Sequence, residues 1–318
     1  MRQYILRRFF LMIPIIIGVS ICTFTLSRMA PGDPLMHYID PDFTQEMREE
    51  MLEKMGFKGP LYIQYLSWLR EALQGNLGRS TQFRSETVVN LVGDKIGPTL
   101  ALTLTSLIIA VLVAVPIGIY SAIRQYSVGD YAFTVGAFLG VSVPSFFLAL
   151  SLIYVFALKL DWLPMAGMYT IGRGGGGLLD RIQHLILPAT ALSMMRLAAF
   201  VRYSRAAMLE VINQDYIRTA RAKGMAEKIV IFKHALRNAA IPIVTMVGLS
   251  LSNLLSGALL IETIFSWPGL GRLSYQAVLQ RDYPVLMGTT LLMSLMVVTG
   301  NLIADITYSI IDPRIRYE

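Results

Sequence analysis

The sequence has 318 residues, of which 54% are hydrophobic and 15% charged, with a mean hydropathy of +0.55 and a net charge of +7. Soluble domains carry about 25% charged residues, so this composition excludes an ordinary soluble domain and predicts an integral membrane protein. The basic residues lie between apolar runs, which argues against a nucleic-acid-binding face. The single cysteine, Cys22, excludes a disulfide framework, and the three histidines are too far apart in sequence to predict a metal site.

Long apolar windows define the predicted spans. A helix needs about 20 apolar residues to cross a hydrocarbon core of about 30 Å. Six windows fit, at residues 9–27, 99–123, 133–158, 185–201, 239–264 and 285–311. The first resembles a signal peptide, but its apolar run is long and the following SRMAPGDP has no small-x-small cleavage site. We therefore expect it to be retained, in an all-α membrane protein with about six transmembrane helices.

The distribution of Lys and Arg predicts the orientation. Basic residues cluster before the first span, between the fourth and fifth spans, and after the sixth. Because such residues stay on the cytoplasmic side, we expect both termini in the cytoplasm. The chain then divides into an N-terminal tail and first helix (1–28), an extracytoplasmic helical region (29–98) and a five-helix transmembrane core (99–318) with a cytoplasmic loop at 202–238.

Two short helices are predicted in the extracytoplasmic region. Asp42 and Gln45 can form a capping box at the start of the first helix, which ends near Gly56. The second begins at Pro60 and ends at Gly75. We expect both to lie against the membrane surface or a neighbouring loop. Contact with a delivered substrate or its carrier is the alternative.

The loop between the fourth and fifth spans includes DYIRTARAKGMAEKIVIFKHALRNAAIPIVT, residues 215–245. Its apolar residues recur at helical spacing on both sides of Gly224, which can adopt backbone angles closed to other residues. The pattern predicts two helices that meet at a turn. The expected apolar faces are Met208, Leu209, Ile212 and Tyr216 before the turn, and Ile229, Phe232 and Leu236 after it. A surface loop that merely obeys the positive-inside rule is the simpler interpretation.

The amino-acid sequence of this loop resembles that of a known protein family. DYIRTARAKG followed by HALRNAAIPIVT is similar to the cytoplasmic loop of permease subunits of ABC importers of the dipeptide, oligopeptide and nickel type. The resemblance extends along the chain to PGDP at residues 31–34, GPTLALT from Gly97, ETIFSWPGLGRL from Glu262 and the C-terminal NLIADITYSIIDPRIRY. Together these motifs are specific, although each alone is weak.

The resemblance implies that the loop is a coupling helix that docks on a separate ATPase subunit. In RTARAKG, Arg218 and Thr219 stand where the general motif has Glu and Ala, whereas Ala220 and Gly224 keep its pattern. Small side chains would permit close approach, and basic ones could pair with acidic groups of the partner. The predicted coupling residues are Arg218, Thr219, Ala220, Arg221, Ala222, Lys223 and Gly224.

The resemblance also implies that translocation and ATP hydrolysis are carried out by different subunits. The chain has no P-loop pattern, so we expect a translocation subunit that is not an enzyme and needs no cofactor or metal. The implied partners are a second related permease, two ATPase subunits, an extracytoplasmic substrate-binding protein and the lipid bilayer, without nucleic acid. The expected location is a bacterial inner membrane. Peptides are the first choice of substrate, and nickel, a metallophore or glutathione the second.

Several polar or small residues lie within the predicted spans. Gly136 and Gly140 predict helix packing within the subunit. Arg196, Glu262 and Asp305 are expected to serve at the interface or in helix pairing rather than in gating, and Trp267 with Pro268 is expected to form a turn at the outer membrane interface. On the fifth span, Gly248, Ser252 and Ser256 form a row of small residues, with Ser250 and Asn253 nearby. This row either packs within the subunit or faces the pathway or the second permease.

Two other classes of protein remain as alternatives. An ion-driven secondary transporter would work without an ATPase, and Pro116 and Pro144 interrupt spans two and three as in such proteins. Spans four to six, however, show no matching repeat. A membrane enzyme is disfavoured because Cys22 and the histidines make no plausible nucleophile–base pair. Transport by the purified chain with an ion gradient and no ATP would identify the secondary transporter.

Overall fold

The computed structural model describes residues 2–29, 44–54, 59–82, 86–172, 176–252 and 258–311, and these residues are mainly helical. The elements in chain order are α1 (Arg2–Met29), α2 (Gln45–Lys54), α3 (Leu61–Leu73), α4 (Val88–Ile123), α5 (Val128–Ser142), α6 (Ser145–Leu152), the π-helix η1 (Ile153–Lys159), α7 (Leu178–Ile212), α8 (Asp215–Ala222), α9 (Glu227–Ile229), the π-helix η2 (Val230–Ala235), α10 (Leu236–Ser252), α11 (Leu259–Ile264), α12 (Leu270–Leu279) and α13 (Tyr283–Ile311).

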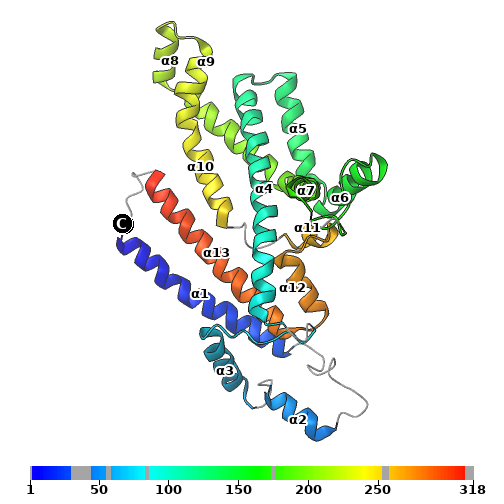
Figure 1. The fold of residues 1–318 in the computed structure, drawn as a ribbon. Helices are drawn as coiled ribbons and strands as arrows, with labels where there is room; N and C mark the ends of the chain where they lie inside the picture. Colours follow the sequence, from blue (N-terminus) through cyan, green and yellow to red (C-terminus); the bar gives the residue numbers. More distant parts are fainter. Residues whose placement is uncertain are drawn as a thin grey trace.

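Within the described residues, five helices are long and apolar enough to cross a membrane, and a bent pair of helices makes a sixth span if it is counted as one. The five are Phe10–Met29, Val88–Ile123, Leu178–Ile212, Glu227–Ser250 and Tyr283–Ile303. The predicted all-α membrane fold is thus confirmed. Figure 1 shows α4 along the length of the molecule, with α8 and α9 near one end and α2 and α3 at the other.

The predicted third span, 133–158, is not one straight helix. Segments Val128–Gly140 and Ser145–Lys159 are bent by 103° relative to each other. Proline lacks a backbone N–H and disfavours helical angles in the residue before it. Accordingly Val143, which precedes Pro144, has extended angles of φ −79° and ψ 127°, and α6 begins directly after Pro144.

The predicted fifth span, 239–264, also divides. Helix α10 is described as far as Ser252, and residues 259–264 form the short helix α11 after Ala258, whose φ of −118° and ψ of 63° are not helical. Two other helices are longer than predicted, because α4 begins at Val88 and α7 extends from Leu178 to Ile212. Hydropathy marked the apolar centre of each helix and missed its polar ends.

Helices α4 and α7 pack together at the centre of the fold and come into backbone contact at Gly118. A Cβ atom there would lie 2.5 Å from Ser204 Cβ and 2.9 Å from the backbone nitrogen of Arg205. The expected packing glycines behave differently: a Cβ at Gly136 would have no heavy atom within 4 Å, and one at Gly140 would lie 3.7 Å from Met194 Sδ. Gly118 belongs to a buried row of small residues spaced by four along α4, with Ala110, Ala114 and Ala122, which the sequence analysis did not single out.

The turn between α11 and α12 is built around the carboxylate of Glu262, which is fully buried. It accepts hydrogen bonds from the Thr99 hydroxyl at 3.1 Å and from the backbone N–H of Arg272, in the first turn of α12, at 2.9 Å. This agrees with a helix-pairing role. The expectation for Trp267 was wrong: its side chain is 1% exposed, and its indole N–H donates to the Pro98 carbonyl at 2.8 Å. The internal carbonyl, and not the membrane interface, satisfies the indole.

The two predicted short helices before α4 are present. Thr44 precedes α2, and its hydroxyl accepts a hydrogen bond from the Met47 N–H at 3.3 Å. Asp42 and Gly56 lie outside the described residues. Helix α3 follows Pro60 and is terminated at Gly75, which has a φ of +84°. Residues 80–82 are held to the start of α13, because the Ser80 hydroxyl and the Gln82 N–H both donate to Asp282.

Candidate coupling elbow

We use the name coupling elbow for residues 215–226, which comprise α8 and the turn that follows it. The turn is a Schellman motif: the Gly224 N–H donates to the Arg221 carbonyl at 2.9 Å, and the Met225 N–H donates to the Ala220 carbonyl at 3.4 Å. Gly224 has a φ of +72° and open space around it, since an added Cβ would meet no heavy atom within 4 Å. Backbone conformation, and not crowding, therefore requires glycine here.

An ion pair closes the elbow across this turn. The Arg221 guanidinium donates from Nη2 to Glu227 Oε1 at 2.7 Å and from Nε to Oε2 at 3.3 Å. These bonds raise the pKa of Arg221 above its ordinary value, since the carboxylate favours the charged guanidinium. Sequence reasoning did not single out Glu227, because no local spacing rule pairs residues across a glycine turn.

The inner face of α8 packs on the membrane-spanning helices. Ile217 is fully buried and Ala220 is 7% exposed. Both belong to a core cluster that includes residues of α4, α7, η2 and α10, namely Ile119, Ala122, Ala207, Met208, Val230, Ile231, Ala235 and Ala239. A further link joins α8 to α10, where the Asn238 amide donates to the Tyr216 hydroxyl at 2.9 Å. The elbow is thus fixed to the ends of three long helices.

The apolar face predicted after the turn was wrong in part. Leu236 packs against the core cluster as predicted, but Ile229 and Phe232 are exposed, and the buried residues are Val230, Ile231 and Ala235. Residues 230–235 form the π-helix η2. A π-helix has more residues per turn than an α-helix, so the 3.6-residue period used to predict the face does not apply there.

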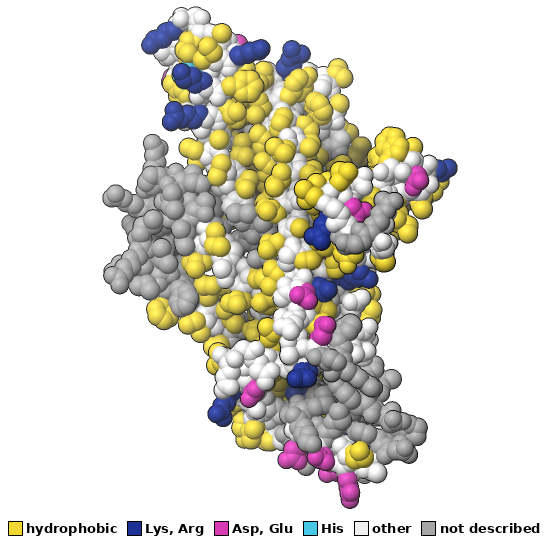
Figure 2. Space-filling model, viewed as in Figure 1, with side chains coloured by type: hydrophobic (Ala, Val, Ile, Leu, Met, Phe, Trp, Pro, Cys, Tyr) yellow, Lys and Arg dark blue, Asp and Glu magenta, His cyan; other side chains and the backbone are white. Residues whose placement is uncertain are grey.

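The outer face of the elbow is exposed and basic. Of the predicted coupling residues, Ala220 is the buried one, whereas Arg218, Thr219, Arg221, Ala222, Lys223 and Gly224 are exposed. Arg218 approaches Asp215 only at 3.5 Å, with both side chains largely in solvent. Figure 2 shows Lys and Arg side chains gathered over α8 and α9 at one end of the molecule. This face presents cations to whatever contacts that end.

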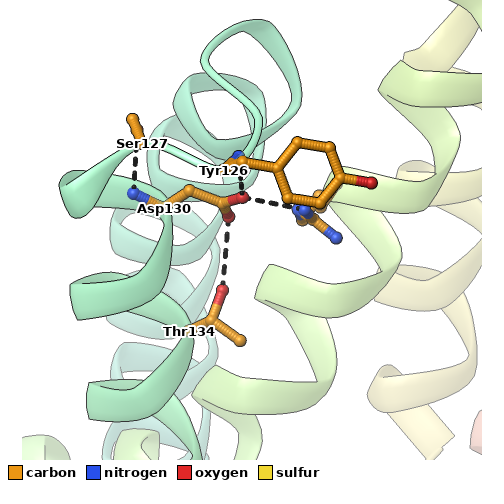
Figure 3. A network of polar contacts seen from close by, with 5 residues as sticks. Tyr126, Ser127, Asp130 and Thr134 are labelled. Carbon is orange, nitrogen blue, oxygen red and sulfur yellow. Dashed lines mark hydrogen bonds and ion pairs between the residues drawn. The ribbon is translucent and has the colours of Figure 1, made fainter.

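A second polar network lies at the same end of the molecule, between the α4–α5 turn and α7 (Figure 3). Asp130 has a 4% exposed side chain and accepts hydrogen bonds from the Tyr126 N–H at 3.0 Å and from Arg205 Nη2 at 2.8 Å. The Ser127 hydroxyl caps α5 by accepting from the Asp130 N–H at 3.1 Å. The network joins the start of α5 to the part of α7 that leads into the elbow.

The row predicted on the fifth span is only partly described. Gly248 has no heavy atom within 4 Å of an added Cβ, and the Ser250 hydroxyl donates to the Met246 carbonyl of its own helix at 2.9 Å. The Ser252 side chain, Asn253 and Ser256 lie outside the described residues, as does the Asp305 side chain. In α7, Arg196 Nη1 is buried and has no hydrogen-bond partner among the described residues. In the described part of the chain, no three His, Cys, Asp or Glu side chains lie together as metal ligands would.

The helices and the elbow define a multi-pass membrane protein. Residues 114–317 match the family described as "Binding-protein-dependent transport system inner membrane component", and residues 1–103 match its N-terminal family, "Binding-prot-dependent transport system membrane comp, N-term". The chain belongs to this family of transport-system membrane components. Its likeness to permease subunits of ABC importers, first indicated by the loop motifs, is therefore confirmed.

Similar proteins cover the whole chain. It is 45% identical to the oligopeptide transport system permease protein AppB of Bacillus subtilis and 38% identical to the dipeptide transport system permease protein DppB of Escherichia coli, with 100% of each chain covered. A structure of the MetNI methionine ABC transporter in inward-facing conformations has a similar fold, with a TM-score of 0.52 and 19% identity over 70% of this chain and 96% of that chain.

Proposed function

We propose that the chain is a translocation subunit of a peptide importer, in which separate ATPase subunits supply the energy. Family membership supports the transport role, and relatives named oligopeptide and dipeptide permeases support peptides as the substrate class. A second permease would complete the pathway, and an extracytoplasmic binding protein would deliver the substrate. The location that fits this role is a bacterial inner membrane.

The topology follows from the same proposal. The elbow end is the cytoplasmic end, because Lys and Arg gather there (Figure 2). Helices α2 and α3 are then extracytoplasmic, since they lie at the opposite end of α4 (Figure 1). A delivered substrate would enter from the side of α2 and α3, and the ATPase would act from the side of α8.

The observation that carries the mechanism is the burial of Ile217. This residue of α8 is fully buried in a cluster with residues of α4, α7 and α10. A force on the exposed basic face of α8 would therefore be transmitted to several spans together, because a packed core does not deform continuously. In this mechanism Arg218 and Lys223 pair with acidic groups of the ATPase, and Gly248 and Ser250 lie on the pathway or at the second permease.

The Gly224→Val variant tests the coupling role. A β-branched residue at positive φ costs roughly 1–3 kcal/mol and would distort the elbow, so we expect assembly in the membrane but a loss of peptide-stimulated ATPase activity. Gly75→Val is the matched control. Gly75 ends α3 with the same motif, its φ is +84°, and an added Cβ would likewise meet no heavy atom within 4 Å. Normal stimulation and uptake in the Gly224 variant would refute the coupling role.

A further inference from the structure

Helix α3 packs against a membrane-spanning helix along one face. The Tyr65 and Ser20 hydroxyls are 2.8 Å apart, and the Phe24 ring centroid lies 5.5 Å from that of Tyr65 and 6.2 Å from that of Trp68. Ser20 and Phe24 both belong to the apolar span Phe10–Met29. Figure 1 shows α3 beside the end of α1 that is farther from the elbow.

These contacts fix the depth of α3 relative to the bilayer. With a rise of about 1.5 Å per residue, Ser20 lies about 13 Å along the helix axis from Met29, at the end of that span. The contact face of α3 is therefore level with the C-terminal half of the apolar span of α1. At this depth the apolar side chains that α3 exposes meet hydrocarbon rather than water.

A second face of α3 is apolar and has no partner among the described residues. Tyr62, Leu66 and Leu73 are 67%, 59% and 80% exposed. Together with the half-buried Leu69 they recur at helical spacing, and 3.6 residues per turn place this stripe roughly a quarter turn from Tyr65 and Trp68. The remaining face is exposed and mainly polar, with Ile63 among Ser67, Arg70, Glu71 and Gln74.

We propose that α3 is an interfacial helix that inserts this stripe, Tyr62–Leu66–Leu69–Leu73, into the leaflet of the membrane opposite the elbow. Through Tyr65 and Trp68 the helix packs on α1 within its apolar span, so the stripe lies beside a part of α1 that lipid surrounds. Lipid must cover the exposed surface of a transmembrane helix, and the same acyl chains then reach the adjoining stripe. Arg70 and Glu71 remain among the headgroups and water. The helix would thereby fix the height of the extracytoplasmic region on the bilayer.

Fluorescent labelling of single cysteines tests this proposal in the assembled transporter. In a Cys22→Ala background, Leu66→Cys places a polarity-sensitive probe on the stripe, and Arg70→Cys places the same probe on the polar face of the same helix. After reconstitution into liposomes, we expect nitroxide-labelled lipids to quench the probe at position 66 and iodide to quench it at least about threefold less than at position 70. Tyr62→Cys is the second stripe position, in case the Leu66 variant does not assemble.

Equal iodide quenching at positions 66 and 70 would overturn the proposal. Shielding of position 66 that develops only when a substrate-binding protein is added would also overturn it, because the stripe would then be a protein-docking surface. The measurement concerns the position of α3 and does not require transport. A transporter that imports peptides with α3 in water would refute this inference and leave the proposed function intact.

Discussion

At the scale of single residues, Asp130 and Arg205 show how a buried charge is held near the elbow. The Asp130 side chain is 4% exposed and its carboxylate accepts bonds from Arg205 and from the Tyr126 backbone. A buried ion pair gives little net stability against an apolar pair, but removal of one partner leaves an uncompensated charge. Substitution of Asp130 or Arg205 alone should therefore reduce the stability of the protein more than neutralising both together.

The Arg205→Gln variant should lower the stability of the protein by roughly 3 kcal/mol, because the Asp130 carboxylate loses its cation. The double variant Asp130→Asn/Arg205→Gln should recover most of this loss, since two neutral amides can still form a hydrogen bond. Thermal unfolding of the purified transporter measures both. Equal losses in the single and double variants would show that the charge pair is not the cause.

At the scale of elements, the α4–α7 contact is a close helix approach that depends on Gly118 of α4. Gly118 lies directly against the backbone of α7. The Gly118→Ala variant would force the helices apart and should cost roughly 1–3 kcal/mol through overpacking. Gly97→Ala is the matched control in the same helix, because an added Cβ there would meet no heavy atom within 4 Å. The melting temperature should fall only for the Gly118 variant, and a similar fall in both would contradict the packing account.

The sequence correctly predicted the helix ends and turns that are set by the backbone preferences of a single glycine or proline. Gly224 predicted the turn after α8, Pro144 interrupts the third span, and Pro60 and Gly75 bound α3, because each residue restricts or permits particular backbone angles by itself. The apolar face after Gly224 was wrong in part, because a π-helical segment changes the period.

The sequence alone did not predict which residues, distant along the chain, form hydrogen bonds and packing contacts with one another. From its sequence position Trp267 was predicted to be interfacial, but in the fold its indole donates to the Pro98 carbonyl. Glu262 accepts a hydrogen bond from Thr99, which is 163 positions away in the sequence. The Arg221–Glu227 pair likewise depends on the turn that brings its two members together. For the candidate site, the motif located the elbow, whereas its inner face at Ile217 emerged only from packing.

At the scale of the whole molecule, the elbow and the helices α2 and α3 lie at opposite ends of α4 (Figure 1). The spans between them connect a basic, exposed tip to the predicted entry side for substrate. The proposed transport cycle needs this separation, since the binding protein and the ATPase must act from opposite sides of the bilayer. The central claim is that movement of α8 is transmitted to α4, α7 and α10. This claim requires another subunit to bind the exposed face of α8.

Site-specific cross-linking of α8 in the assembled transporter tests that claim most directly. In a Cys22→Ala background, Ala222→Cys places a thiol on the exposed face of the elbow without adding charge or much bulk. We predict that a short thiol-reactive cross-linker joins it to an ATPase subunit, and that an impermeant thiol reagent added from the extracytoplasmic side does not reach it. A thiol that reacts freely from that side, or that forms no cross-link to any ATPase subunit in an active transporter, would contradict the account.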